Sequence, residues 1–170
     1  QMLASVMFDL RPIYGDGSLF AGLQQQTLRL AQANSIFVSH MAANSVRSSP
    51  PLGLFGGLAT IRSGEHKRRI DFKHAGVVPI VDLARLYALQ GRLTPVNTRA
   101  RLLAARDANL LSKSGAKDLL DAYDLICEVR LEHQAAQIRA GQKPDNFVSP
   151  DVLSDLERNH LREAFGVIKT

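Results

Sequence analysis

Apolar residues recur at helical spacing along most of the chain. The longest such pattern covers residues 19–47, where Leu19, Leu23, Leu30, Phe37 and Met41 recur at steps of four or seven residues. It predicts one continuous helix of about 28 residues, roughly 42 Å long at 1.5 Å per residue. Similar spacing predicts helices at 77–91, 98–109, 117–140 and 152–168. We therefore predict a mainly α fold, a bundle of about five helices.

Shorter apolar runs predict a small β-sheet beside these helices. Residues 3–8 form the first expected strand, and residues 58–62 and 69–73 form an expected hairpin. Because two strands alone are only marginally stable, we expect the N-terminal strand to pair with the hairpin. The resulting sheet would gather four polar side chains: Asp9, Arg11, Asp71 and Lys73.

Length and composition indicate one globular domain. The chain has 170 residues, of which 45% are hydrophobic and 22% are charged, as in ordinary packed domains. Cys127 is the only cysteine, so an internal disulfide is excluded and a reducing, cytoplasmic setting is expected. No apolar run approaches the ~20 residues that span a bilayer, and we expect no membrane partner. Because Gln1 lies within an apolar stretch, we expect the chain to be cut from a longer multidomain protein.

The charge pattern permits an anionic partner without identifying one. The net charge of +5 favours anions such as nucleotides or phosphates, but the charges are mostly interspersed, as on a solvated surface. Nucleic acid is not predicted, because the basic cluster at 66–69 has no stacking aromatic residues and no recognised motif. The glycines at 53–57 lack the Lys-Ser/Thr of a phosphate loop. The sequence also has no Gly-x-Ser-x-Gly turn and no His-x-x-x-His zinc pair.

Polar residues at apolar positions are the first candidates for function. Arg130 falls on the inward stripe of the second long helix, and His133 follows it. A buried arginine must be paired, so Arg130 forms either a structural ion pair across the bundle or an anion-binding group at a cleft. The alternating charges of Arg69, Asp71 and Lys73 allow a similar choice between a solvated strand face and a polar rim that faces a ligand.

A third polar group lies around the start of the helix at 98–109. Asn97 and Thr98 are interpreted as capping residues. Arg101 lies one turn beyond them, and Arg85 lies on the preceding helix. Both arginines could therefore turn toward the same polar pocket.

Six stretches of sequence are informative as a set: FDLRPIYGD at 8–16, PPLGLFGG at 50–57, RRIDFKHAGVVPIVDLARLYAL at 68–89, NTRARL at 97–102, AYDLICEVRLEHQ at 122–134 and LSDLERNHLREAF at 153–165. Together they resemble the C-terminal, substrate-binding domain of bacterial nucleotidyltransferases that carry CBS and cyclic-nucleotide-binding regulatory domains. Those enzymes are similar to the PII-uridylyltransferase and glutamine-synthetase adenylyltransferase group. The resemblance covers nearly the whole chain.

The resemblance implies a metal-dependent transferase. In such enzymes an Asp-x-Asp pair and a third carboxylate hold two Mg²⁺ ions, which bind the nucleoside triphosphate and activate the acceptor. Asp9, in its Asp-x-Arg-Pro stretch, matches the third carboxylate and is the implied catalytic and metal-binding residue. The sequence contains no Gly-Ser followed by an Asp-x-Asp pair. We therefore expect the other metal ligands outside these residues, and we expect the chain alone to be inactive and to hold no cofactor.

We thus expect residues 1–170 to form a single helical accessory domain that shapes the acceptor pocket of a signal-transduction nucleotidyltransferase. The expected substrate contacts are Arg11, Asp71, Lys73, Arg101, Arg130 and His133. The expected partners are an upstream catalytic domain and regulatory domains of the same chain, a nucleotide, and a protein or small-molecule acceptor. The alternative is a helical interaction or dimerisation module, because long amphipathic helices can also bury a partner helix or form a homodimer.

Overall fold

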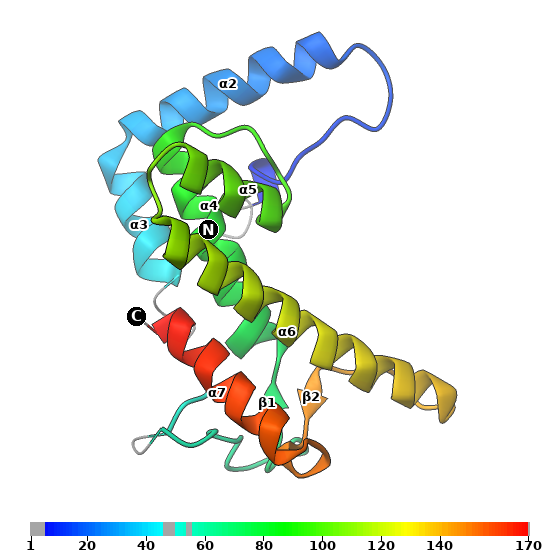
Figure 1. Ribbon diagram of the computed structural model, residues 1–170. Helices are drawn as coiled ribbons and strands as arrows, with labels where there is room; N and C mark the ends of the chain where they lie inside the picture. Colours follow the sequence, from blue (N-terminus) through cyan, green and yellow to red (C-terminus); the bar gives the residue numbers. More distant parts are fainter. Residues whose placement is uncertain (1–5, 46–49, 54–55, 170) are drawn as a thin grey trace. The chain divides into compact units, whose positions relative to one another are not determined.

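The computed structural model describes residues 6–45, 50–53 and 56–169. Within these residues it contains six α-helices and one two-stranded antiparallel sheet (Figure 1), which confirms the predicted mainly α fold with a small sheet. The chain forms two compact units: a first unit of Gln1–Arg47 and Val81–Ala116, and a second unit of Ser48–Ile80 and Lys117–Thr170. In the described part of the chain, no helix is both long and apolar enough to cross a membrane.

The first unit is built from helices. They are α2 (Gly17–Ala33), α3 (Ser35–Ser45), the greater part of α4 (Val78–Gly91) and α5 (Thr98–Asp107). Its core gathers around Leu28, Met41 and Leu89, which are almost fully buried. The predicted cap of α5 is confirmed, because the Asn97 side chain accepts the Ala100 N–H at 3.2 Å.

The single long helix predicted at 19–47 is wrong, because the chain breaks at Asn34. This residue has extended backbone angles, φ −98° and ψ 92°, between α2 and α3. Its side-chain oxygen accepts the Phe37 N–H at 3.0 Å and so caps the start of α3. Apolar residues keep their helical spacing across the break, and periodicity alone therefore did not reveal it. With 17 residues, α2 spans about 26 Å.

The second unit combines two helices with the sheet. Its regular elements are most of α6 (Lys113–Arg139), β1 (Ile70–Asp71), a π-helical turn (Lys73–Val77), β2 (Phe147–Val148), a 3₁₀ turn (Pro150–Val152) and α7 (Asp155–Lys169). Phe72 and Phe165 are fully buried and meet edge to face, with ring centroids 6.0 Å apart. Gly76 packs against this core so closely that a Cβ there would lie 2.8 Å from Ile126 Cγ2.

The sheet differs from the predicted one in its partner strand. β1 pairs antiparallel with β2, so that Ile70 lies opposite Val148. Residues 58–62 form no regular strand, although Ile61 exchanges backbone hydrogen bonds with Arg68 and Arg69 at 2.9 Å. The predicted hairpin is therefore replaced by a pairing between segments far apart in the sequence.

The N-terminal strand predicted at 3–8 is also wrong where the structure describes it. Val6 and Met7 are helical and lead into a turn at Asp9, while residues 3–5 lie outside the described residues. Asp9 belongs to the first unit and Asp71 to the second. The two carboxylates thus do not share a sheet, contrary to the prediction.

Candidate functional site

Asp9 is held by two arginines from different helices of the first unit. Arg85 of α4 donates from Nε to both carboxylate oxygens at 3.2 Å and from Nη2 to Oδ2 at 2.5 Å. Arg101 of α5 donates from Nη1 to Oδ1 at 2.8 Å. The prediction that Arg85 and Arg101 turn toward one polar pocket is confirmed, and Asp9 is the group that they share.

The other guanidinium nitrogens of both arginines are also used inside the unit. Arg101, which is only 2% exposed, donates from Nε to the Pro95 carbonyl at 2.8 Å and from Nη2 to the Phe8 carbonyl at 2.5 Å. Arg85 donates from Nη1 to Asp82 at 2.6 Å. Two guanidinium groups and two carboxylates therefore balance in charge. All three guanidinium nitrogens of Arg101 thus already form hydrogen bonds within the fold. Its role in substrate binding stays a prediction.

Burial and charge act on the Asp9 carboxyl in opposite directions. Burial alone would raise its pKa, but hydrogen bonds and positive charge from Arg85 and Arg101 outweigh burial and hold the pKa below its ordinary value. Burial and the nearby charge of Arg85 together lower the pKa of Arg101 more than Asp9 raises it, yet an arginine stays protonated at neutral pH. Asp9 and the two arginines are therefore charged at neutral pH.

The first unit should lose stability in acid through Asp9. The folded pKa of this carboxyl lies below the unfolded value of about 3.9. The ionised carboxyl therefore contributes to the free energy of unfolding above the unfolded pKa, and this contribution is lost as the pH falls through the folded pKa. Urea unfolding between about pH 6 and about pH 3 should show this loss. The Asp9→Asn variant should show a weaker pH dependence than Asp118→Asn, an exposed control. Equal pH dependence in the two variants would contradict the assignment.

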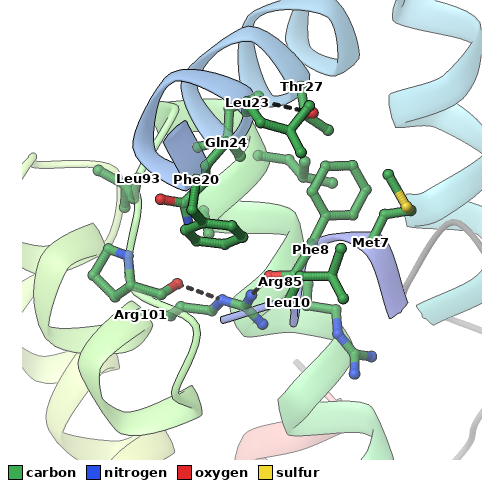
Figure 2. Close-up of a pocket in the computed structure, with 14 residues that line it drawn as sticks. Met7, Phe8, Leu10, Phe20, Leu23, Gln24, Thr27, Arg85, Leu93 and Arg101 are labelled. Carbon is green, nitrogen blue, oxygen red and sulfur yellow. Dashed lines mark hydrogen bonds between the residues drawn. The ribbon is translucent and has the colours of Figure 1, made fainter. Parts of the chain in front are cut away.

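A narrow pocket lies beside this cluster within the first unit (Figure 2). Figure 2 shows the rings of Phe8 and Phe20 in its wall together with Arg85 and Arg101, whose guanidinium reaches the carbonyl of Pro95. The volume open to the centre of a water molecule is only about 20 Å³, which is space for about one water. The pocket is therefore too small for a nucleotide in this conformation.

The described residues do not fit a magnesium site. No three His, Cys, Asp or Glu side chains among them lie close enough together to hold a metal ion. Both oxygens of Asp9 already accept guanidinium N–H groups, and two adjacent positive charges disfavour a divalent cation. That Asp9 joins metal ligands outside this sequence stays a prediction.

The second unit carries a polar cluster centred on the loop residue Asp145. Its Oδ1 lies 2.9 Å from His133 Nε2 and accepts the Phe147 N–H at 2.9 Å, while its Oδ2 lies 3.6 Å from Arg69 Nη1. Gln137 of α6 supports the loop by accepting the Asp145 N–H at 2.8 Å. Burial alone would raise the pKa of Asp145, but the hydrogen bonds from Phe147 and His133 outweigh it and the pKa is lowered.

Arg130 meets the next loop residue, Asn146. Its Nε donates to Asn146 Oδ1 at 2.6 Å, and Gln134 donates to the same oxygen at 3.3 Å. The partner of Arg130 is thus an amide, not the acid expected for a structural ion pair. The Asn146 carbonyl also accepts the Phe72 N–H at 3.0 Å and ties the loop to the sheet region. Among the hydrogen bonds of the described residues, Arg130 donates only from Nε, and the residue is half-buried.

Sequence reasoning missed the loop that organises this cluster. Asp145, Asn146 and Phe147 lie between the helices predicted at 117–140 and 152–168, and none of them was predicted to take part in a site. The His66 ring lies parallel to the Phe147 ring, with centroids 3.5 Å apart. His66 Nδ1 is buried and has no hydrogen-bond partner among the described residues. The available signal was an Asp-Asn pair before a short apolar segment. An Asp-Asn pair does not indicate which helix the loop will contact.

Of the other predicted contacts, Arg101 holds Asp9 in the first unit, and Asp71 lies opposite Phe147 in the sheet. Arg11 and Lys73 are exposed. Asp71 accepts two backbone N–H groups at the start of the π-helical turn, at 3.1 and 3.0 Å. Of the predicted substrate contacts, the structure brings Arg130 and His133 together at residues 145 and 146.

Comparison with known proteins identifies the family. Residues 35–170 match the family described as "Putative nucleotidyltransferase substrate binding domain". No curated protein and no solved structure shows a significant match to the chain. The matched region includes the cluster at 145–146 but not Asp9. Because the match covers most of the sequence, the chain belongs to this family of nucleotidyltransferase substrate-binding domains.

Proposed function

We propose that the second unit binds an anionic group of a nucleotidyl-transfer substrate at Arg69, Arg130 and His133, which we call the 145–146 site. The most direct support is that three basic side chains from two separate segments contact the same two loop residues, 145 and 146. Membership of a family of substrate-binding domains makes a substrate the expected ligand of such a group.

Arg130 is the principal contact in this proposal. Its two terminal guanidinium nitrogens can donate parallel N–H···O bonds to a phosphate or a carboxylate. The side chains of His133 and Arg69 are 19% and 43% exposed, so a solute can reach both. Asp145 holds His133 through Nε2 and thereby sets the orientation of the ring. The site thus offers a fork of donors beside two further basic groups.

We propose that the chain acts with a separate catalytic domain and does not transfer a nucleotide itself. The described residues bring no cluster of carboxylates together. Magnesium, with Asp9 as one ligand, is proposed only for the intact enzyme and together with ligands outside this sequence. Further contacts from Arg11, Asp71, Lys73 and Arg101 remain predictions.

The wider setting is proposed from sequence resemblance alone. In that setting residues 1–170 form one domain of a cytoplasmic bacterial signal-transduction enzyme, whose CBS and cyclic-nucleotide-binding domains regulate transfer to a protein or small-molecule acceptor. The family match supports the substrate-binding part of this description. The regulatory part rests on the six stretches quoted above.

The chain should bind phosphate-bearing probes at the 145–146 site. We expect ATP and inorganic pyrophosphate each to shift the amide NMR signals of residues 145–148 in the isotope-labelled chain. Replacing Arg130 with glutamine removes the fork of donors and should weaken binding about tenfold, or ~1.4 kcal/mol. Incubation with labelled ATP and magnesium should leave the nucleotide untransferred.

The matched control for this experiment is Arg162→Gln. Arg162 is an exposed arginine of α7 in the same unit, so its replacement removes the same charge away from the site and should leave the affinity unchanged. If both variants lost the same affinity for the probes, the loss would reflect the net charge of the chain and not a contact at Arg130. Binding of neither probe, or shifts elsewhere in the chain, would reject the site. Nucleotide transfer by the chain alone would reject the need for a separate catalytic domain.

A further inference from the structure

The outer face of α2 is exposed yet almost free of charge. α2 and α3 contain 17 and 11 residues, and Arg29 is the only Asp, Glu, Lys or Arg in them, whereas 22% of the whole chain is charged. Solvated helices of globular proteins carry charged or polar outer faces. Depletion of charge is instead typical of the centre of protein interfaces. The composition of this region therefore indicates a contact surface.

The exposed apolar residues of α2 lie in one line along the helix. Leu19, Leu23 and Leu30 are 78%, 53% and 60% exposed. Together with Gln26 and Ala33 they follow one another at alternating steps of four and three residues, which is the spacing of a coiled-coil seam. We call these five residues the α2 stripe. A seam of this kind packs against another helix.

The opposite face of α2 is already occupied within the first unit. Leu28 lies in the core. Gln24 donates to the Thr94 carbonyl at 2.8 Å, and Gln32 donates to the Gln90 carbonyl at 2.5 Å. The α2 stripe is therefore a second apolar face. Leu23 and Leu30 also border pockets of the first unit, but both stay more than half exposed.

A second copy of the chain suits the α2 stripe as its partner. In a two-fold symmetric interface each patch faces itself, so like charges would repel. The stripe contains no charged residue and avoids this penalty. Gln26 lies at its middle and carries both donors and an acceptor, so the two copies can hydrogen-bond to each other there. A single polar residue in a seam is a known means of setting register and oligomeric state.

We propose that the chain forms a homodimer in which the α2 stripe of one copy packs against the α2 stripe of the other. This proposal goes beyond substrate binding and does not depend on it, because the 145–146 site belongs to the second unit and α2 to the first. Either proposal can fail without the other.

Sedimentation and light scattering of the 170-residue chain test the dimer. We expect a concentration-dependent monomer–dimer equilibrium with a dissociation constant in the micromolar range. The double variant L23E/L30E places four carboxylates in the seam and should weaken the dimer about 100-fold or more. The matched control is L131E/I138E on α6, which changes two leucine-sized residues at the same seven-residue spacing and similar exposure, 67% and 62%. The control should leave the dimer unchanged.

A disulfide experiment tests the same contact without added charge. In a Cys127→Ser background, Gln26→Cys should form an interchain disulfide on oxidation, whereas Gln25→Cys, which lies off the α2 stripe, should not. Circular dichroism verifies that each variant keeps its helices. The proposal is overturned if the chain stays monomeric at ~100 μM. That result is expected if the α2 stripe binds a separate catalytic domain and not a second copy. The proposal is also overturned if L23E/L30E stays dimeric or if the α6 control dissociates equally.

Discussion

Replacing Arg101 with methionine is expected to lower the free energy of unfolding of the first unit by about 3 kcal/mol. Methionine can fill much of the space of the arginine stem but donates no hydrogen bond. Asp9 and the carbonyls of Phe8 and Pro95 would each lose a donor. Because Arg101 is only 2% exposed, water cannot readily replace it. Urea unfolding at neutral pH, followed by circular dichroism, measures the loss.

Two further variants distinguish the stability lost with the Arg101 hydrogen bonds from the stability lost with any positive charge. Arg11→Met removes an exposed arginine and should change stability by less than about 0.5 kcal/mol. Arg101→Lys keeps the charge but lacks the planar fork that reaches three acceptors, so it should fall between the wild type and Arg101→Met. A cost for Arg101→Met no larger than that of the Arg11 control would show that the network does not hold this unit together. Arg101 would then be free for the substrate role predicted from the sequence.

Replacing Phe165 with alanine is expected to destabilise the second unit by about 4 kcal/mol. Phe165 is fully buried, packs edge to face with Phe72 and lies close to Gly76. Its loss would leave a cavity that the surrounding helices can fill only in part. Urea unfolding measures the change, with Leu156→Ala as the control on the same helix, since Leu156 is 63% exposed.

This variant also tests how the core supports the 145–146 site. The Phe72 N–H donates to the Asn146 carbonyl, so movement of Phe72 into the cavity would displace the loop. We therefore expect Phe165→Ala to weaken ATP binding as well as stability, and Leu156→Ala to change neither. A destabilised variant with unchanged ATP affinity would show that the loop keeps its geometry independently of this core.

Helices whose boundaries depend on neighbouring residues were predicted well. The segments 77–91 and 98–109 correspond to α4 and α5 within two residues at each end. The Asn97 cap was recognised because its partner lies three residues away. At the last helix the prediction began too early: residues 150–152 form a 3₁₀ turn, and α7 starts after Ser154, which forms a capping box with Glu157.

Pairings over long sequence separations were predicted less well. β1 takes β2 as its partner across more than seventy intervening residues, and a strand two residues long has no pattern strong enough to indicate a partner. The role of Asp145 could not be predicted for the same reason. Its contacts to His133 and Gln137 depend on how the loop folds back against α6.

The sequence by itself determined α4, α5, the cap of α5 and the resemblance to the family, because periodicity, capping and motif identity are properties of neighbouring residues. It also singled out Arg85, Arg101, Arg130 and His133 as polar residues of possible function. Only the tertiary structure decided what their partners are. Asp9 takes both Arg85 and Arg101, and the loop at 145–146 takes Arg130 and His133. The physical reason is that a buried charge must find an acceptor, whereas the chain segment that supplies it depends on packing.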